Sequence, residues 1–374
     1  MDAIFPLSDT QALMQSSLQR WLQDNAPFER RAALLATPQA VTPLWTGLAQ
    51  HLGLLGTALP EAAGGQGGGL AEHLVILQAL GHALLPEPYA ACMVSGAGLL
   101  QRLAGAHTAQ LLAGVADGAV RPVLAALEPT ARHDLGQVAS RLHADGSLSG
   151  RKAVVRAAPQ ASHWLVSARD ASGTLRLALV RPGAAGVAQR DLRLADGSWA
   201  AELGFDHTPT EALLGEAGTD VLPLLQQVAD EALLATGAEC VGVMQRLLQD
   251  TIEYVRQRKQ FGVAIASFQV TQHRLADMHM ALLQARALVA ATLPWMDQAA
   301  PDRGRAVAAA QVAVARAARA VGQGAVQLHG GMGVTDELAV GHGFKRLTLI
   351  EHHQGSLAVH LQRVASWQAA QAVA

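Results

Sequence analysis

Two segments of the chain carry residues suited to binding an anionic or flat ligand. The first, Arg258–Gly262, reads RKQFG and ends a long helical pattern. The second starts at Gln327 and includes Gly330 and Gly331, directly after an Ala- and Val-rich run. Arginine presents a planar fork of donors that matches phosphate oxygens, and glycine allows close backbone approach because it lacks a Cβ. As a set, in this order and spacing, the two segments predict a cofactor site.

Each segment also has a purely structural interpretation. Arg258 and Lys259 fit the last turn of a helix, where cations interact favourably with the helix dipole. Gly330 and Gly331 fit the end of a helix, where a left-handed residue is common. Taken singly, the two segments leave both interpretations open.

A group of histidines near the C-terminus invites comparison with a metal site. These are His329, His342, His352, His353 and His360. Adjacent residues of a helix point in different directions, so His352 and His353 do not face one site. No Cys or carboxylate accompanies the histidines at a familiar ligand spacing. The sequence therefore predicts no metal centre.

Composition narrows the class of protein. The 374 residues are 50% hydrophobic but 4% aromatic, with Ala, Leu and Val prominent, which favours packed helices. The net charge of −2 argues against a general nucleic-acid-binding protein, which usually has a basic domain. Cys92 and Cys240 lie far apart among apolar residues and are predicted to be free thiols. With no signal-peptide pattern and no apolar run of about 18 residues, we expect a cytoplasmic protein without a membrane span.

The chain divides into three segments with different sequence patterns, and the elements of these segments must position the candidate residues. Residues 1–119 show helical patterns, beginning with a helix that Ser8 can cap. Residues 120–217 contain short β-type runs separated by glycine-bearing turns, which predicts a small antiparallel β domain. Residues 218–374 return to long helical periodicity and predict a four-helix bundle.

Two expectations concern the bundle itself. Its fourth helix is predicted as one continuous element over about 344–369. Its third helix, about 302–325, is rich in Ala and Val and has few large side chains. We therefore expect another subunit to bury much of the apolar surface of the third helix.

The helix–β–helix order, with these motifs inside it, resembles the acyl-CoA dehydrogenase family over essentially the whole chain. The resemblance is carried by RKQFG at 258–262, SFQ at 267–269, HRLADM at 273–278 and QLHGGMGVTDE at 327–337. The extension AVGHGFKRLT at 339–348 is most similar to small subunits of pimeloyl-CoA dehydrogenase and their bacterial relatives. The resemblance implies a mainly α fold with an N-terminal helical domain, a middle antiparallel β-barrel or sandwich and a C-terminal four-helix bundle.

The resemblance also implies an FAD cofactor and a tetramer, in which the pyrophosphate and adenine of FAD reach a neighbouring subunit. Arg258 would contact the pyrophosphate, and Phe261 would pack near the adenosine half. The turn after Gln327 would approach the cofactor across the subunit interface. The residues implied in FAD binding are Arg258, Gln260, Phe261, Gln269, Gln327, Gly330, Gly331 and Ser356.

Members of the family remove the α-proton of an acyl-CoA thioester with a carboxylate. This sequence lacks that carboxylate at its usual position. Most members carry a Glu before a Gly-Thr or Gly-Ser pair; here Gln354 takes that place before Gly355 and Ser356. A neutral amide does not act as a general base. Glu351, nearly one helical turn earlier, and Glu231, beside the position where a minority of the family places its base, are the candidates. A third interpretation is that this chain supplies no base.

Four functional hypotheses follow. The first is an FAD-dependent dehydrogenase of an acyl- or dicarboxylyl-CoA ester, which passes electrons to an electron-transfer flavoprotein as a homotetramer. The second is an FAD-binding subunit of a heterotetramer whose partner supplies the base. The third is a flavin-dependent monooxygenase on the same fold, and the fourth is a scaffold that binds no flavin.

The middle domain departs from the family as well. Many members hold the flavin with a Thr-Glu-Pro-x-x-Gly-Ser-Asp run. The corresponding segment here, Leu127–Asp134, reads LEPTARHD, so Glu128 and Pro129 match but the Gly-Ser pair is missing.

Overall fold

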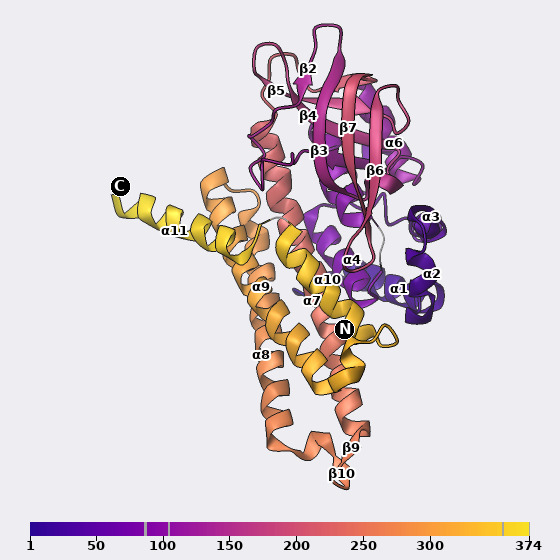
Figure 1. Ribbon diagram of the computed structural model, residues 1–374, viewed down its shortest axis with the longest axis vertical. Helices are drawn as coiled ribbons and strands as arrows, with labels where there is room; N and C mark the ends of the chain where they lie inside the picture. The colour runs from indigo at the N-terminus through magenta and orange to yellow at the C-terminus, as the bar shows by residue number, and fades with distance from the viewer. Residues whose placement is uncertain (86–87, 104, 354, 374) are drawn as a thin grey trace. The chain divides into compact units, whose positions relative to one another are not determined.

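The computed structural model describes residues 1–85, 88–103, 105–353 and 355–373 (Figure 1). These residues form two compact units. The first unit contains residues 1–31, 74–85 and 233–374, and the second contains residues 32–73 and 86–232. Among the described helices, none is both long and apolar enough to cross a membrane.

An eight-stranded sheet forms the centre of the second unit, in the order β6-β7-β3-β2-β4-β5-β8, with β1 beside β4. β4 and β5 are buried almost throughout, as expected for continuous apolar runs covered on both faces. Most neighbouring strands pair antiparallel, as predicted, and β1 and β2 pair with β4 in parallel. The strands are β1 (Pro122–Ala125), β2 (Arg141–Leu142), β3 (Ser147–Arg156), β4 (His163–Arg169), β5 (Leu175–Val180), β6 (Val187–Arg193), β7 (Trp199–Pro209) and β8 (Ala212–Leu214).

Short helices accompany the sheet in the second unit. Trp45 is fully buried and donates from its indole N–H to the carbonyl of Gly118, at 3.0 Å. The helical elements are α2 (Arg31–Leu35), α3 (Thr42–Gln50), a π-helical segment (Ala90–Ala97), α5 (Gly98–Arg102) and α6 (Ala106–Ala116). Helix α4 (Leu70–His82) and helix α7 (Leu222–Gln257) each belong partly to both units.

The predicted N-terminal helix cap is confirmed in the first unit. Helix α1 spans Asp9–Asn25, and the Ser8 hydroxyl accepts the backbone N–H of Gln11 while the Gln11 side chain accepts the backbone N–H of Ser8. This reciprocal arrangement satisfies two donors that a helix start leaves open. Leu18 and Leu22 lie on the buried face.

Long helices build the rest of the first unit: α7, α8 (Gln269–Thr292), α9 (Ala300–His329), α10 (Ala339–His353) and α11 (Leu357–Val373). Helix α9 packs against α8, α10 and α11. A Cβ at Gly324 of α9 would lie 2.7 Å from the sulfur of Met278 on α8, so the absence of a side chain at Gly324 lets Met278 pack closely against α9. The contact also sets the register of the α8–α9 pair and brings the start of α8 beside the end of α9.

The predicted fourth helix is wrong in one respect, because it is two helices. Helix α10 ends at His353 and α11 begins at Leu357. Between them Gly355 has a φ of +117°, a conformation that ends a right-handed helix and that glycine adopts without strain.

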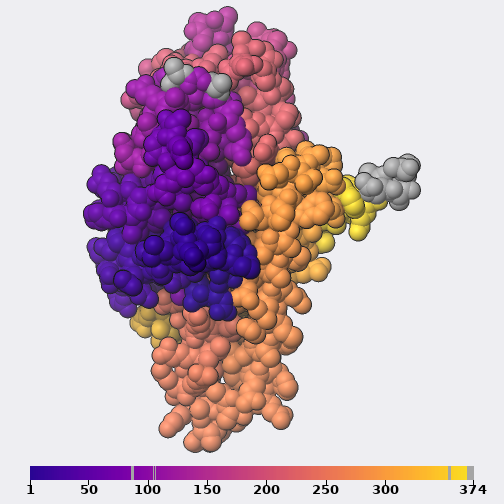
Figure 2. All heavy atoms as spheres, turned by 180° about the vertical axis from the view of Figure 1, so that it is seen from behind, coloured from indigo at the N-terminus to yellow at the C-terminus, as the bar shows by residue number. Residues whose placement is uncertain are grey.

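The apolar residues of α9 are covered within the chain, so the expectation that another subunit buries them is wrong. Val307, Val314 and Val321 of α9 are buried within the chain, because its small residues admit neighbouring helices closely. Helix α8 instead buries one apolar face and exposes another. Its exposed residues include Val270 (70%), Met280 (53%), Leu283 (37%) and Leu288 (40%). The salmon and orange atoms of α8 are visible at the surface in Figure 2.

Candidate functional site

A β-hairpin presents the RKQFG segment beyond the end of α7. Strand β9 (Lys259–Gln260) pairs with β10 (Val263–Ala264) around a two-residue turn. Phe261 and Gly262 in the turn have φ values of +53° and +80°, which is the backbone pattern of a type I′ turn. A left-handed conformation costs a non-glycine residue roughly 1–2 kcal/mol, yet Phe261 holds it with 93% of its surface exposed. Strained residues of this kind cluster at active sites and ligand-binding sites.

The second segment forms a tight turn at the end of α9. Gly330 has φ +60° and ψ −139°, and a 3₁₀ turn follows over Gly330–Val334. A Cβ at Gly330 or Gly331 would meet nothing within 4 Å, whereas a Cβ at Gly333 would lie 2.7 Å from the carbonyl oxygen of Val326. Gly333 is therefore needed for packing. Gly330 is needed for backbone conformation, and with Gly331 it leaves the main chain open to a ligand.

These two segments lie at the same end of the first unit. Tyr254, one turn before Arg258, stacks on His329, the last residue of α9, with ring centroids 4.2 Å apart. Gln269 begins α8, beside the end of α9, and Phe261 makes an edge contact with Phe268 just before it. We call this group of predicted residues the hairpin end: Arg258, Gln260, Phe261, Gln269, Gln327, Gly330 and Gly331.

The chemistry of the hairpin end fits a dinucleotide cofactor. It combines a guanidinium for phosphate, exposed amides, open glycine backbone and an aromatic ring on which a base can stack. Every one of these residues is exposed. In Figure 1 the β9–β10 hairpin lies at the lower end of α7 and α8.

Ser356 is not brought to the hairpin end. It lies just beyond α10, whereas the Gly330 turn lies just before it. The helix has 15 residues, which corresponds to about 22 Å at about 1.5 Å per residue. The structure thus separates the predicted FAD residues into two groups at opposite ends of α10.

Glu351, near the end of α10, is held by an arginine of α9. Arg319 contacts both carboxylate oxygens of Glu351, one of them through its Nε at 3.0 Å. The Glu351 side chain is 5% exposed, while that of Arg319 is 50% exposed. Glu351 also lines a cavity of about 20 Å³ together with Cys240, Gln311 and His360. A space of this size holds a water molecule rather than an acyl chain.

Glu231, in the second unit, is also paired with an arginine. The Arg102 guanidinium lies 2.7 Å from Glu231 Oε1, and Gln227 donates to the same oxygen at 3.3 Å. Arg102 is anchored in turn by the carbonyl of Gly98, at 2.9 Å. Each of the two candidate carboxylates therefore forms an ion pair with an arginine. The third predicted position, Gln354, lies outside the described residues.

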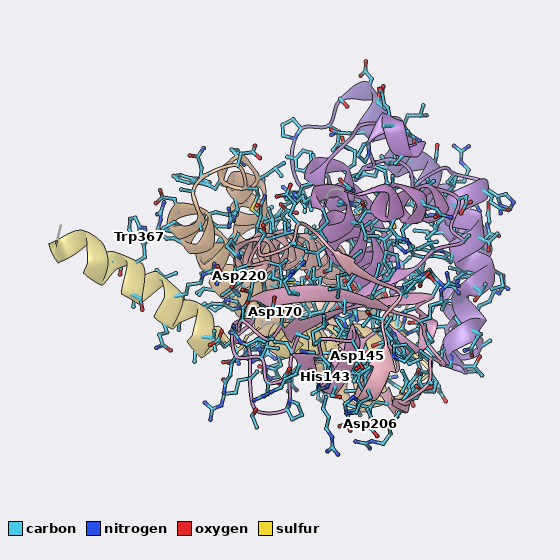
Figure 3. The ribbon with its side chains drawn as sticks, turned by 90° about the horizontal axis from the view of Figure 1, so that it is seen from above. His143, Asp145, Asp170, Asp206, Asp220 and Trp367 are labelled. Atoms are coloured by element: carbon cyan, nitrogen blue, oxygen red, sulfur yellow. The ribbon has the colours of Figure 1, made fainter. Side chains whose placement is uncertain are left out.

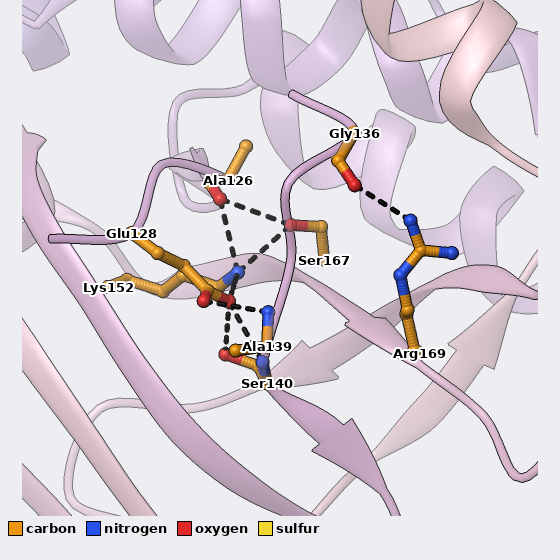
Figure 4. Close-up of polar contacts among 8 residues, drawn as sticks. All are labelled: Ala126, Glu128, Gly136, Ala139, Ser140, Lys152, Ser167 and Arg169. Atoms are coloured by element: carbon orange, nitrogen blue, oxygen red, sulfur yellow. Dashed lines mark hydrogen bonds and ion pairs between the residues drawn. The ribbon is translucent and has the colours of Figure 1, made fainter. Parts of the chain in front are cut away.

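A buried ion pair holds Leu127–Asp134, the middle-domain segment in which the Gly-Ser pair of the family is missing (Figure 4). Lys152 Nζ lies 2.8 Å from Glu128 Oε1 and also donates to the Ala126 carbonyl and the Ser167 hydroxyl. Glu128 further accepts the backbone N–H groups of Ala139 and Ser140. The carboxylate thereby ties the start of the segment to residues eleven and twelve positions later.

Burial sets the protonation properties of this pair. Burial lowers the pKa of Lys152 to about 8, although Glu128 acts in the opposite direction. Burial raises the pKa of Glu128, but hydrogen bonds from Lys152 and Ser140 outweigh it and leave the pKa below its usual value. The neighbouring Val154 has a φ of +48° at a bulge of β3 and is 47% exposed, which is unusual for a β-branched residue.

The sequence alone did not identify Lys152 or Tyr254. It placed Ala153, Val154 and Val155 where the family usually has the Trp-Ile-Thr strand that backs the flavin. Lys152 lies beside Arg151 in a strand that also carries two serines, so nothing in the sequence marks it as buried. The tyrosine one helical turn before Arg258 was the available signal for Tyr254. The conformation of Val154 has no signal in a single sequence.

The histidines do not form a metal centre in the part of the chain that the structure describes. There, no group of three or more His, Cys, Asp or Glu side chains is arranged to hold a metal ion. His143, labelled in Figure 3, stacks on His207 with ring centroids 4.5 Å apart. Asp145, also labelled there, is occupied by the backbone and hydroxyl of Ser147.

Comparisons with known proteins agree with this geometry. The model described as acyl-CoA dehydrogenase, N-terminal domain, matches residues 8–118, and that described as acyl-CoA dehydrogenase, C-terminal domain, matches residues 224–369. The acyl-CoA dehydrogenase FadE27 of Mycobacterium tuberculosis is 31% identical over 328 residues, which cover 86% of each chain.

Solved structures show the same fold. A variant of the Tcur3481-Tcur3483 steroid ACAD is 30% identical to this chain, with a TM-score of 0.87 over 98% of this chain and 99% of that one. The ChsE4-ChsE5 complex from Mycobacterium tuberculosis is 27% identical, with a TM-score of 0.85 over 99% of each chain. The predicted fold class, mainly α with a central β domain, is confirmed. The chain belongs to the acyl-CoA dehydrogenase family of oxidoreductases.

Proposed function

We propose that this chain takes part in the FAD-dependent α,β-dehydrogenation of an acyl-CoA thioester, with an electron-transfer flavoprotein as electron acceptor. Family membership supports the reaction class. The observation that carries the cofactor assignment is the hairpin end, where a strained and exposed Phe261 lies near the open backbone of Gly330 and Gly331. The edge contact with Phe268 leaves the Phe261 ring exposed, and a Cβ at Gly330 or Gly331 would meet nothing within 4 Å.

In this proposal the hairpin end holds the dinucleotide half of FAD. Arg258 donates to the pyrophosphate, and the ring of Phe261 packs against the adenosine. The main chain of Gly330 and Gly331 lies against the cofactor, with the amides of Gln260, Gln269 and Gln327 around it. When bound, FAD supplies the redox chemistry by accepting the β-hydrogen of the substrate as a hydride.

The reaction also needs a base for the α-proton, and one observation favours a base from outside this chain. Both candidate carboxylates are held by arginines: Glu351 by Arg319 and Glu231 by Arg102. Taking up the substrate proton would require either carboxylate to give up its ion pair. We therefore propose that a second acyl-CoA dehydrogenase-like chain supplies the base, so that this chain is the cofactor-binding subunit of a heterotetramer.

Two further observations support an assembly. The exposed apolar residues of α8, which are Val270, Met280, Leu283 and Leu288, form a surface that another chain could cover. Ser356 and the Gly330 turn lie at opposite ends of α10, so they contact different parts of one cofactor or two different cofactors. Two structurally similar proteins, ChsE4-ChsE5 and Tcur3481-Tcur3483, carry the names of two chains.

The test is the visible spectrum of the protein before and after anaerobic addition of CoA esters. The panel includes straight-chain, dicarboxylyl and steroid-derived esters, the last because the 30% identical relative is described as a steroid ACAD. The chain is purified alone and after co-expression with a second family chain from the same source. We expect flavin absorbance, with bleaching by a CoA ester only in the complex.

Variants of the complex locate the base. We expect Glu231→Gln and Glu351→Gln to leave bleaching intact. Glu202→Gln is the matched control, because Glu202 also pairs with an arginine, Arg190, but is not a candidate base. Bleaching of the chain alone that disappears in one of the two variants would place the base in this chain. A complex without flavin would overturn the cofactor assignment.

A further inference from the structure

The rings of Tyr254 and His329 connect the two parts of the hairpin end, which are the β9–β10 hairpin and the turn after α9. The rings of Tyr254 and His329 are nearly parallel, with an interplanar angle of 25° and centroids 4.2 Å apart. The Tyr254 hydroxyl also lies 3.4 Å from the carbonyl oxygen of His329, a long and weak hydrogen bond. The stack therefore consists mainly of ring contact between α7 and α9, helices whose contact residues are 75 positions apart in the chain.

His329 is built into the turn that follows it. The residue is 5% exposed, and its Nδ1 lies 2.8 Å from the Ala325 carbonyl oxygen. A carbonyl oxygen only accepts, so Nδ1 carries a hydrogen and donates it. Burial lowers the pKa of His329, which keeps the imidazole neutral. Gly333 folds back over this side chain, because a Cβ there would lie 3.1 Å from the Cβ of His329.

Tyr254 is linked directly to the β9–β10 hairpin. Its backbone carbonyl accepts the N–H of Arg258 at 2.8 Å, and the carbonyl of Arg258 accepts the N–H of Ile265 at 2.9 Å, which closes the hairpin. Residues four apart on a helix share a face, so Tyr254 and Arg258 lie one above the other. A shift of the Tyr254 ring therefore moves the base of the hairpin.

We propose that the Tyr254–His329 stack is a positioning element that fixes the hairpin at Arg258–Phe261 relative to the turn at Gln327–Gly331, and that FAD affinity depends on it. This inference rests on the FAD role proposed above. Neither ring needs to touch the cofactor. Each of the two elements carries only part of the site, so FAD binds tightly when their spacing is set beforehand.

Three variants test the inference. Tyr254→Leu removes the ring, whereas Tyr254→Phe keeps the ring and removes only the weak hydroxyl contact. Trp295→Leu is the matched control, because Trp295 is an aromatic residue, 38% exposed, near the opposite end of the α8–α9 pair. Each variant is made in the full chain, within the complex if FAD binding requires the complex, and its melting temperature is recorded without FAD.

The first readout is the dissociation constant of FAD, measured by titrating the FAD-free protein and following flavin fluorescence. An aromatic pair contributes about 0.5–1.5 kcal/mol beyond its buried area, so Tyr254→Leu is expected to weaken FAD binding roughly three- to tenfold. Tyr254→Phe and Trp295→Leu should stay within about twofold of the wild type. Equal affinities for Tyr254→Leu and Tyr254→Phe would overturn the inference.

The second readout does not depend on FAD. Hydrogen–deuterium exchange of the FAD-free protein reports the order of residues 259–264 and 330–334 separately. We expect Tyr254→Leu to speed exchange in both segments, although the substitution lies in neither, and Tyr254→Phe to leave both unchanged. Unchanged exchange in the Leu variant would refute the positioning role. If the wild type binds no FAD, the proposed function fails, while this measurement still decides whether the stack couples the two segments.

Discussion

Replacing Lys152 with methionine is the most direct perturbation of the middle domain. Lys152 is 1% exposed and donates to three acceptors, among them Glu128. Methionine has a similar length but no charge, so Lys152→Met leaves the Glu128 carboxylate without a cation. Removal of one partner of a buried ion pair costs about 3–5 kcal/mol.

The remaining contacts of Glu128 set the expected value within that range. The carboxylate keeps the N–H groups of Ala139 and Ser140, at 2.8 and 3.0 Å, and the Ser140 hydroxyl, at 2.7 Å. These donors still stabilise the anion, so we expect a loss at the lower end, about 3 kcal/mol of the free energy of unfolding. Lys345→Met is the matched control. Lys345 pairs with Asp336 at the same 2.8 Å, but the two side chains are 41% and 78% exposed, and such pairs contribute about 0–1 kcal/mol.

The assay is urea unfolding of the purified full-length protein at neutral pH, followed by circular dichroism and by tryptophan fluorescence. Trp164 is fully buried in β4 and reports on the same sheet. If Lys152→Met loses no more stability than Lys345→Met, the buried pair does not hold the segment that begins at Glu128.

The other predictions concern pH, the hairpin and the first helix. The pKa of Lys152 is lowered to about 8, and an unfolded lysine titrates near about 10.4. Between these values the unfolded state binds more protons, so the free energy of unfolding of the wild type should rise with pH relative to Lys152→Met; a difference that is flat or falls over this range would contradict the assignment. Asparagine suits a type I′ turn, so Phe261→Asn should raise the free energy of unfolding of the FAD-free protein by up to about 1 kcal/mol. The same substitution should weaken FAD binding by about tenfold, because the stacking ring is lost. Unchanged FAD affinity in a titration would show that Phe261 is not part of the site. Ser8→Ala should lower stability by about 1 kcal/mol through loss of the helix cap, whereas Ser16→Ala, inside the same helix, should have a smaller effect in the same urea assay.

The sequence predicted those helix ends and strands that depend on residues close together in the chain. The cap of Ser8 on α1 is confirmed, and three of the β-type runs of the middle segment became β1, β4 and β5. The break of the fourth bundle helix was missed, because apolar periodicity continues on both sides of Gly355 and a glycine inside a helical pattern is often tolerated.

The candidate site was predictable only in part for the same reason. The RKQFG and QLHGG motifs are contiguous in sequence, so their residues could be named in advance. The partners of Glu231 and Glu351 could not, because Arg102 and Arg319 lie 129 and 32 positions away. Pairing across such separations depends on helix packing, which one sequence does not specify. The stack of Tyr254 on His329 belongs to this second class.

The exposed apolar face of α8 has a consequence for how stability measurements must be made. Val270, Met280 and Leu288 are in contact with water in the single chain, and covering them with a second chain removes that contact. Folding is then linked to association by mass action, so the melting temperature rises with protein concentration. Unfolding data for this chain are therefore comparable only at a fixed protein concentration.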